Sequence, residues 1–241
     1  MNKSAIIVGA SSGIGLEVAK QLLAEGWRLG VAARREGPLL ELKAMAPERV
    51  EVMTIDVTRP DAGERLLSLA ERLGGMDLYF HASGIGKQNR TLQEDIELRT
   101  MQTNAVGFTR MTGTAYRYFA ERGGGHIAAI TSIAGTKGLG PAPAYSATKA
   151  LQANYLQALE QQARQRGLNI LFTDIRPGFV DTALLNDDFS YPMLMRPEKV
   201  ARDIVRSISL RRHVRVIDWR YRILTFFWRL LPGWLWRRLK L

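Results

Sequence analysis

The sequence predicts one α/β domain built on a single doubly wound sheet of about seven parallel strands, with helices on both faces and an amphipathic helical tail at the C-terminus. Three observations predict this fold. Short apolar runs alternate with segments of helical periodicity along the chain, as repeated βαβ units require. Several runs, residues 6–8 and 170–172 among them, are continuously hydrophobic, which is typical of parallel strands covered on both sides. A glycine-rich turn joins the first of these runs to the first helix.

The same patterns give the order of the elements. Strands are expected near residues 4–9, 28–33, 50–55, 76–82, 126–131, 169–175 and 213–217. Helices are expected near residues 13–25, 38–46, 61–73, 91–120, 143–166 and 197–209. Because no internal repeat or low-complexity linker interrupts this order, we divide the 241 residues into a main domain, 1–210, and an extension, 211–241, which contains the last strand.

Composition narrows the chemistry that this chain can perform. The sequence contains no cysteine, which excludes disulfides and thiolate metal sites. Its three histidines, His81, His126 and His213, are widely spaced, so no metal site is expected. The apolar stretch after Lys3 is too short for a secretory signal. We therefore expect a cytoplasmic protein whose acid–base chemistry comes from other side chains.

The net charge of +11 is concentrated at one end of the chain. Residues 211–241 hold nine Lys and Arg against one acid, Asp218, which is +8. The remaining 25 basic and 22 acidic residues give only +3. The basicity therefore belongs to the extension, and it does not indicate a protein that binds nucleic acid over its whole surface.

The turn after the first strand has the spacing of a dinucleotide-binding loop. It reads G-x-x-x-G-x-G, with Gly9, Gly13 and Gly15 at its three glycine positions. Glycines allow a tight turn and let backbone N–H groups approach a pyrophosphate at the positive end of a helix. Three glycines alone would be weak evidence, but their place between a strand and a helix favours a Rossmann-type cofactor site. Its expected contacts are Gly9, Ser11, Ser12, Gly13, Ile14 and Gly15.

The end of the second strand favours NADP(H) over NAD(H). An NAD site places a carboxylate about 20 residues after the glycines, where this chain has Ala33 followed by Arg34 and Arg35. Arg34 can pair with a 2′-phosphate, and Arg35 can assist. A solvated basic surface is the alternative. Asp56, with Val57 after it, follows the third strand and suits the adenine amino group, although an exposed turn acid would look the same.

A tyrosine and a lysine four residues apart begin the helix expected at 143–166. Tyr145 and Lys149 share one helical face. Tyrosine has an ordinary pKa of about 10, and a nearby cation lowers it, which makes the phenol a usable general acid or base. Ser132 ends the fifth expected strand, where an open parallel sheet binds its ligand, and could hydrogen-bond a substrate oxygen. Helix capping by Ser132 and packing by Tyr145 are the alternatives.

Together these features resemble the classical short-chain dehydrogenase/reductase family over about residues 4–210. The residues that carry the resemblance are those at 9–15, Asn104 within 101–105, Ser132, the Tyr145/Lys149 pair and residues 176–178.

The resemblance implies hydride transfer at a nicotinamide ring and a catalytic tetrad. In that tetrad Tyr145 exchanges the proton, Lys149 lowers its pKa and holds the nicotinamide ribose, and Ser132 orients the carbonyl. Asn104 would support a proton-relay water. Further cofactor contacts are implied at Ala82, Gly84, Pro177, Gly178, Val180 and Thr182.

One motif departs from the family pattern. After the fourth strand the family usually has Asn-Asn-Ala-Gly, whereas this chain has His81 followed by Ala82, Ser83 and Gly84. The usual asparagine links neighbouring strands, and a ring nitrogen of His81 could make that link. A structural histidine is favoured over a catalytic or pH-sensing one.

Two segments bear on substrate and partners. Apolar residues within 179–196, from Leu184 to Met195 and including Phe189, suggest an apolar or amphiphilic substrate, although they could instead pack on the protein itself. In the tail, a helix is expected over 218–231 with Asp218, Arg222, Thr225 and Arg229 as one polar stripe, and a second short helix is expected to end at Lys240.

Four of the five tryptophans lie in the tail. A peripheral membrane contact through 218–241 and a hydrophobic subunit interface both fit this composition, and nucleic acid comes third.

The sequence therefore predicts an NADP(H)-dependent oxidoreductase that interconverts a small-molecule carbonyl and an alcohol, as a homo-oligomer, dimer or tetramer. The alternative is a regulatory protein that binds NADP(H) without turnover, for which a complete Ser/Tyr/Lys set would be unnecessary.

Overall fold

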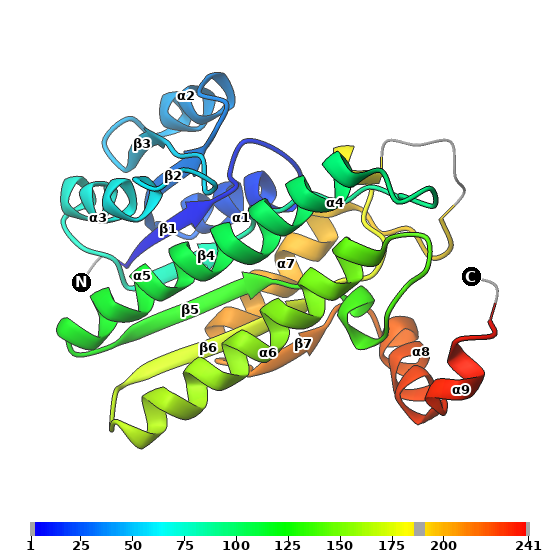
Figure 1. The fold of residues 1–241 in the computed structure, drawn as a ribbon. Helices are drawn as coiled ribbons and strands as arrows, with labels where there is room; N and C mark the ends of the chain where they lie inside the picture. The colour runs from blue at the N-terminus through cyan, green and yellow to red at the C-terminus, as the bar shows by residue number, and fades with distance from the viewer. Residues whose placement is uncertain (1–2, 186–190, 240–241) are drawn as a thin grey trace.

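The computed structural model describes residues 3–185 and 191–239. Its core is a seven-stranded sheet in the order β3-β2-β1-β4-β5-β6-β7, in which every neighbouring pair is parallel (Figure 1). The strands are β1 (Ser4–Val8), β2 (Arg28–Ala33), β3 (Val50–Thr54), β4 (Leu78–His81), β5 (Gly125–Ile130), β6 (Ile170–Arg176) and β7 (Val214–Val216). The predicted fold class is confirmed, and all seven expected strands are present.

The strand order creates the crevice in which a ligand would bind. The chain moves outward from β1 to β3 and then crosses back to β4 on the other side of β1. In doubly wound sheets, ligands bind at the carboxyl ends of the strands beside such a reversal. The loops that follow β1, β4 and β5 therefore meet at one edge of the sheet, and they carry Gly9, Gly84 and Ser132.

Helices cover both faces of the sheet (Figure 1). One apolar cluster joins the sheet to α1, α2, α7 and α8, and a second joins the opposite face to α3, α5 and α6. The bounds are α1 (Gly13–Ala24), α2 (Gly37–Met45), α3 (Ala62–Leu73), α5 (Phe108–Glu121), α6 (Pro143–Gln165), α7 (Pro197–Ser209) and α8 (Trp219–Leu230). The central strands β1 and β4 are completely buried between the two layers, as their continuous hydrophobic sequences predict.

The helix expected over 91–120 is wrong as a single regular element. The structure has α4 (Glu94–Met101), a π-helical stretch η1 (Gln102–Gly107) and then α5. A π-helical turn contains an extra residue, which displaces the backbone from the regular hydrogen-bonding pattern, and such turns are frequent at functional sites. Asn104 lies inside this stretch with its side chain fully buried. Helical periodicity in the sequence does not reveal an inserted turn.

The tail also differs from its predicted form. Helix α8 is followed by α9 (Gly233–Trp236), which ends before the arginines at 237 and 238 rather than at Lys240, and Lys240 lies outside the described residues. Thr225 is not part of an exposed polar stripe. It is buried, and its hydroxyl finds a partner within the helix by donating to the Tyr221 carbonyl at 2.8 Å. Among the described residues, no helix is long and apolar enough to cross a bilayer.

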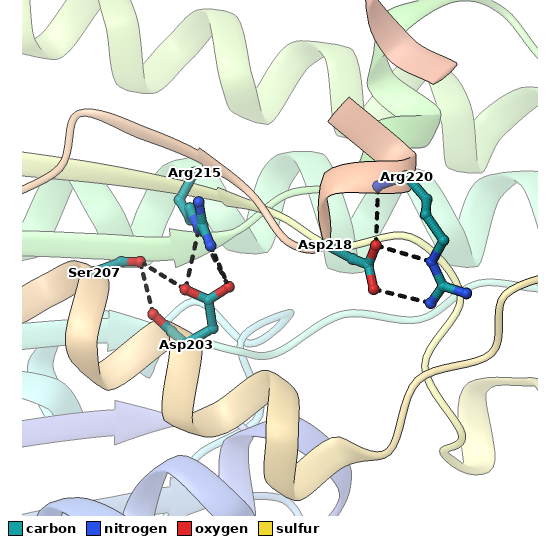
Figure 2. Close-up of polar contacts among 5 residues, drawn as sticks. All are labelled: Asp203, Ser207, Arg215, Asp218 and Arg220. Atoms are coloured by element: carbon teal, nitrogen blue, oxygen red, sulfur yellow. Dashed lines mark hydrogen bonds and ion pairs between the residues drawn. The ribbon is translucent and has the colours of Figure 1, made fainter. Parts of the chain in front are cut away.

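Two ion pairs fasten the last strand and the tail (Figure 2). Arg215 on β7 donates to Asp203 on α7, with its terminal nitrogen 2.6 Å from Oδ2. Asp218 accepts from both the backbone N–H and the guanidinium of Arg220, at 2.9 Å in each case, and so caps the start of α8. The first ion pair therefore ties β7 to α7, and the second fixes the first turn of α8.

Candidate active site

The glycine-rich loop leaves room for a ligand backbone contact at the start of α1. Gly9 has φ +96°, and a Cβ there would lie 2.5 Å from the Ser83 nitrogen. A Cβ on Gly15 would lie 2.2 Å from the Gly9 carbonyl oxygen, so the loop can close only with glycine at both positions. The Ser12 side chain makes no capping bond to α1. The positive end of this helix therefore faces the sheet edge without an internal anion, which suits a pyrophosphate.

The two arginines after β2 have different surroundings. Arg35 lies over the glycine-rich loop, where its guanidinium donates to Ser12 Oγ at 2.9 Å and to Ser11 Oγ at 3.3 Å. Arg34 is exposed, and its charge helps to lower the pKa of Asp56, as do the bonds that Asp56 Oδ1 accepts from Thr58. Burial works against these effects at Asp56 and is the largest single influence on it. Arg35 therefore makes the direct contacts with the loop, whereas Arg34 acts on Asp56 through its charge.

Three of the residues expected to contact the cofactor pack closely against other parts of the protein, namely Val57, Ala82 and Gly84. Val57 is buried and packs against Gly107 of η1. Ala82 lies against Gly15, and its backbone N–H donates to the Val8 carbonyl at 2.7 Å. A Cβ on Gly84 would approach Asn104 Oδ1 to 3.3 Å and Lys149 Nζ to 3.7 Å. Fold topology thus brings the loops after β1 and β4 against the helices that carry the candidate tetrad.

The segment after β6 lies against the glycine-rich loop at Gly13. Thr182 would be 3.2 Å from a Cβ at Gly13, and its hydroxyl lies 3.4 Å from the Val180 carbonyl. The Pro177 carbonyl accepts from the Ile133 N–H at 3.1 Å, which ties this segment to the turn after Ser132. Val180 pairs with Met195 in an isolated bridge. Phe189 of the expected substrate segment lies outside the described residues.

Ser132 and Tyr145 lie close together at the carboxyl end of β5, near enough for the serine side chain to affect the pKa of the phenol. Ser132 follows the end of β5 by two residues and caps a short 3-10 turn, where its Oγ accepts the Ala134 N–H at 3.0 Å, so the capping role that the sequence left open is present. The Tyr145 ring packs against the Gly86 backbone, where a Cβ would come within 2.8 Å of the ring carbons. Burial raises the pKa of Tyr145, and the Ser132 side chain opposes that rise. The phenol is therefore protonated at neutral pH and can donate a proton to a bound oxygen.

The expectation that Lys149 lowers the pKa of Tyr145 is not what the protein alone shows. Lys149 Nζ is 5.7 Å from the centroid of the tyrosine ring. It donates instead to the Ile130 carbonyl at 3.0 Å and to Gln152 Oε1 at 2.9 Å. Burial outweighs any such effect of the ammonium group on the phenol.

Lys149 itself is strongly perturbed. Its side chain is buried, and burial lowers its pKa to about 8, although the negative charge of Asp174 favours the protonated form. Asp174 is also buried and is bonded to Thr131 and Arg176. A lysine that is charged but close to titration is a common feature of proton-transfer sites.

Asn104 is fixed by four hydrogen bonds. Its Oδ1 accepts from the Ile85 N–H at 2.9 Å. Its Nδ2 donates to the Ile85 carbonyl at 2.7 Å and to Thr148 Oγ1 at 3.3 Å. Its backbone carbonyl accepts from Gln152 Nε2 at 2.8 Å. Gln152, which is fully buried, therefore connects the Asn104 carbonyl directly to the Lys149 ammonium.

Sequence reasoning missed Gln152, Thr148 and Asp174. Gln152 lies three residues after Lys149, and this spacing places two side chains on the same helical face. That spacing was the available signal, but it also fits an ordinary buried glutamine. Asp174 alternates with Arg176 along β6, and the pattern alone cannot show that its charge reaches Lys149.

His81 is a buried structural histidine. Its Nδ1 lies 2.7 Å from the Tyr79 hydroxyl, and its ring packs edge-on against Phe108 with centroids 4.9 Å apart. Burial lowers its pKa to about 3, and the positive charge of Lys149 contributes to the fall. The ring is therefore neutral at physiological pH. Tyr79 belongs to the same strand, β4, so this bond does not make the link between neighbouring strands that was expected of His81.

A separate groove of about 490 Å³ lies outside this constellation. It is lined by the loop 135–140 and by Pro143, Ser146, Ala147 and Ala150 of α6. Neither Tyr145 nor Lys149 lines it, because those residues project from another face of the same helix. The candidate catalytic residues lie instead at the carboxyl end of the sheet, where loops from distant parts of the chain meet.

Comparisons with known proteins agree with this geometry. A family model described as short chain dehydrogenase matches residues 3–191. An uncharacterized oxidoreductase of Myxococcus xanthus is 32% identical over 219 residues, which is 85% of this chain and 85% of that protein. An uncharacterized oxidoreductase of Mycobacterium tuberculosis, Rv0945, is 29% identical over 223 residues, covering 89% of this chain and 87% of the relative.

Solved structures give the same result. A variant of actinorhodin polyketide ketoreductase, solved with NADPH, has a TM-score of 0.75 and 27% identity, covering 85% of this chain and 89% of its own. A short-chain dehydrogenase from Streptomyces avermitilis has a TM-score of 0.83 at 22% identity, covering 95% of this chain and 93% of its own. At that lower identity, the similarity speaks for the fold.

Proposed function

The chain belongs to the short-chain dehydrogenase family, and from this premise we propose that it interconverts a carbonyl and an alcohol with NADP(H). One observation carries the proposal. Ser132, Tyr145 and Lys149 lie together at the carboxyl end of β5, where Lys149 Nζ is 5.7 Å from the centroid of the Tyr145 ring and the serine side chain lowers the pKa of the phenol. A protein that only sensed the dinucleotide would have no use for a buried proton donor at this position.

In the direction of reduction, the chain's own residues bind and protonate the carbonyl oxygen. Ser132 Oγ donates a hydrogen bond to that oxygen and so fixes its position beside the phenol. Tyr145 transfers its proton to the oxygen as negative charge develops there. The buried ammonium group of Lys149 then stabilises the resulting phenolate through space. Bound NADPH supplies the hydride that reduces the carbonyl carbon.

The residues present fit a phosphorylated dinucleotide. The Gly9 and Gly15 positions admit no side chain, which leaves the loop backbone open to a pyrophosphate. Arg34 and Arg35 present two cations beside it and no carboxylate that could bind a ribose 2′-hydroxyl. The similarity to a ketoreductase solved with NADPH supports the same cofactor.

The catalytic proposal is tested by Tyr145→Phe. We expect carbonyl reduction to fall at least about 100-fold, because the ring remains while its proton is lost. NADPH affinity, measured by fluorescence titration, should stay within a factor of about three, since the hydroxyl is not expected to contribute most of the cofactor binding. Turnover equal to that of the unaltered enzyme would overturn the proposed role of Tyr145.

Cofactor preference is tested by the two arginines separately. Arg34→Asp and Arg35→Asp should each weaken NADPH relative to NADH, by about tenfold for the loss of one charge-assisted contact. Arg59→Asp, a change of the same charge at a nearby exposed position, is the control. If the ratio of kcat/KM for the two cofactors is unchanged in both variants, neither arginine recognises the phosphate.

The substrate we propose is a small apolar or amphiphilic carbonyl compound or alcohol. The described part of the segment after β6 presents Phe179, Tyr191 and Leu194, and the Phe179 and Tyr191 rings are 4.6 Å apart. A panel of hydrophobic ketones, aldehydes, 3-oxoacyl thioesters and sugars, monitored by NADPH absorbance, tests this class. A clear preference for sugars would contradict it.

We also propose a cytoplasmic homo-oligomer, a dimer or a tetramer. Large apolar side chains are exposed on the outer surfaces of α4 and α6, namely Leu98, Met101 and Leu151. Covering these side chains in a subunit contact would remove apolar area from water. Sedimentation equilibrium measures the mass directly, and a monomer at micromolar concentration would contradict this part of the proposal.

A further inference from the structure

Helix α8 carries apolar side chains on two opposite faces. Its inner face, formed by Tyr221, Leu224, Thr225 and Trp228, packs against the body of the protein. Its outer face presents five large apolar side chains, with exposed fractions between 49% and 67%. We call this second surface the outer stripe, and it consists of Trp219, Ile223, Phe226, Phe227 and Leu230.

The tail is attached to the protein mainly by the inner face of α8 and by α9. Tyr221, which is fully buried, and the packed pair Trp228 and Trp236, with ring centroids 5.3 Å apart, supply that attachment. Positions 219, 223, 226 and 230 follow spacings of four, three and four residues, which form one continuous helical face. Five exposed apolar side chains on one helix form a contiguous patch of the kind that marks an interaction surface.

Arginines lie along one edge of the outer stripe and at the end of the tail. Arg222 and Arg229 lie along one edge of it, and Arg237 and Arg238 follow α9, where Arg238 lies 5.8 Å from the exposed Trp234 ring. Between residues 211 and 239, the only acidic side chain is Asp218, and it is already paired with Arg220. The surface therefore combines exposed aromatic rings with cations and offers no free carboxylate of its own.

We propose that the outer stripe, with its flanking arginines, binds an anionic lipid surface. A helix that lies in a bilayer interface buries an apolar face at the level of the headgroups and holds basic side chains toward anionic lipid phosphates. Tryptophan and arginine suit that boundary, because each combines an apolar body with a polar or charged tip. The absence of a spanning helix among the described residues is compatible with a helix that lies on the surface.

A second copy of this chain fits the same surface less well. In a two-fold contact, the same patch meets itself, so Arg222, Arg229, Arg237 and Arg238 of one copy would face the same residues of the other. The only acid in the patch is occupied, so this contact would bring uncompensated like charges together. An anionic bilayer accepts both the rings and the cations without that cost.

The tail also contacts the segments that flank the candidate active site. The Tyr221 hydroxyl accepts from the Phe179 N–H at 3.2 Å and donates to the Pro192 carbonyl at 2.9 Å, which connects α8 to both described parts of the substrate segment. Lys137, on the loop that precedes Tyr145, donates to the Leu231 carbonyl at 3.0 Å, and Trp236 Nε1 donates to the Gly138 carbonyl at 2.7 Å.

Figure 1 shows α8 and α9 at the end of the sheet where α6 begins. If the proposed function holds, docking on a bilayer places the site next to amphiphilic carbonyl compounds that reside in that bilayer.

Co-sedimentation with vesicles tests the membrane contact without any need for activity. The intact protein should bind vesicles of phosphatidylcholine and phosphatidylglycerol at least about tenfold more tightly than vesicles of phosphatidylcholine alone, and high salt should weaken the binding. Phe226→Gln/Leu230→Gln and Arg222→Gln/Arg229→Gln should each reduce binding by about 10- to 30-fold.

Leu40→Gln/Met45→Gln, which changes two exposed apolar residues on the distant helix α2, is the matched control and should bind as the unaltered protein does. Equal melting temperatures show that all variants fold. Failure of the unaltered protein to bind the anionic vesicles, or unchanged binding by the stripe variant, overturns the proposal. A stripe variant that changes only the oligomeric mass assigns the surface to a second copy instead.

A second measurement separates this inference from the proposed function. A long-chain methyl ketone carried in anionic vesicles should lose about tenfold in rate with the stripe variant, whereas a short water-soluble ketone should not. Vesicle binding without any ketone reduction would leave the membrane contact standing and refute the enzymatic proposal. Reduction of both ketones without vesicle binding would support the enzymatic proposal and refute the membrane contact.

Discussion

At the scale of single residues, the surroundings of Lys149 have the largest chemical consequence. Its ammonium lies in a buried site where it meets a backbone carbonyl and the Gln152 amide, and burial lowers its pKa to about 8. Gln152 thus acts as a positioning residue that connects Lys149 to the Asn104 carbonyl.

Replacing Gln152 with Met should reveal that role. The change keeps the side-chain volume but removes the acceptor from Lys149 and the donor from Asn104, so we expect kcat to fall about tenfold, the equivalent of one buried hydrogen bond. Because the charged ammonium loses a partner, the pKa of Lys149 should fall further, and the alkaline limb of the kcat profile should move to lower pH.

Gln152→Glu retains an acceptor for Lys149 and should return that limb toward higher pH. A lower melting temperature with no shift in the pH profile of either variant would reduce Gln152 to a packing role.

His81 makes stability sensitive to acid. Its pKa is about 3 in the folded protein and near 6.5 when unfolded, so between these values the unfolded chain binds more protons. Stability is therefore complete above about pH 6.5 and is lost as the pH falls toward 3, by about 2 kcal/mol at pH 5 from this group.

Urea unfolding at pH 7 and pH 5 measures this term. The difference in free energy of unfolding between pH 7 and pH 5 should be smaller by about 2 kcal/mol in His81→Asn, which has no titrating ring. Gln161→Asn, a change at an exposed residue that does not titrate, should behave as the unaltered protein does. Equal pH dependence in all three proteins would mean that His81 contributes nothing to acid unfolding.

At the scale of elements, the turn between β7 and α8 determines how the tail leaves the sheet. Asp218 has φ +72°, a conformation that aspartate tolerates better than most residues, and its side chain caps α8 while binding the Arg220 guanidinium. Arg215 and Asp203 brace the other side of the turn (Figure 2). This short strand and the helix after it therefore behave as one unit.

Loss of the cap should weaken that unit. Asp218→Ala removes the capping oxygen and the ion pair, so we expect the free energy of unfolding to fall by about 1 to 2 kcal/mol. Asp218→Asn keeps the capping oxygen and the positive φ and should cost less. Urea titrations give both values, and an alanine variant as stable as the asparagine variant would contradict the capping role.

At the scale of the whole molecule, the tail belongs to the core as well as to the surface. Tyr221 is completely buried, and its ring passes so close to Gly178 that a Cβ there would lie 2.2 Å away. The same short helix thus completes the apolar cluster on one face of the sheet and exposes the outer stripe. Deleting the tail would change both features together, whereas surface substitutions separate them.

A chain truncated after residue 217 should be less stable than the stripe variant. Removing Tyr221, Trp228 and Trp236 exposes their apolar partners, and we expect a loss of at least about 3 kcal/mol, comparable to that of truncating one large core side chain. Thermal unfolding and NADPH titration of the two proteins make the comparison. A truncated chain that melts at the original temperature would show that the tail is an independent attachment.

The sequence alone determined the features that depend on neighbours in the chain. Alternating apolar runs gave the seven strands within about two residues, and short motifs placed the glycine-rich loop and the Tyr145/Lys149 pair. These features are readable because a glycine turn, a strand and one helical face each depend on residues a few positions apart. The π-helical stretch at Asn104 was not predicted, because an inserted turn barely disturbs the helical periodicity of the apolar residues.

Only the tertiary structure decided the contacts between distant segments. It placed Gln152 between Lys149 and Asn104, put Arg35 rather than Arg34 over the serines of the loop, and divided the apolar residues of α8 into a packed and an exposed face. A sequence pattern shows that a side chain is apolar or charged. Whether that side chain is buried, paired or exposed depends on elements brought against it by folding, and here that division separates the core of the tail from its proposed lipid-binding surface.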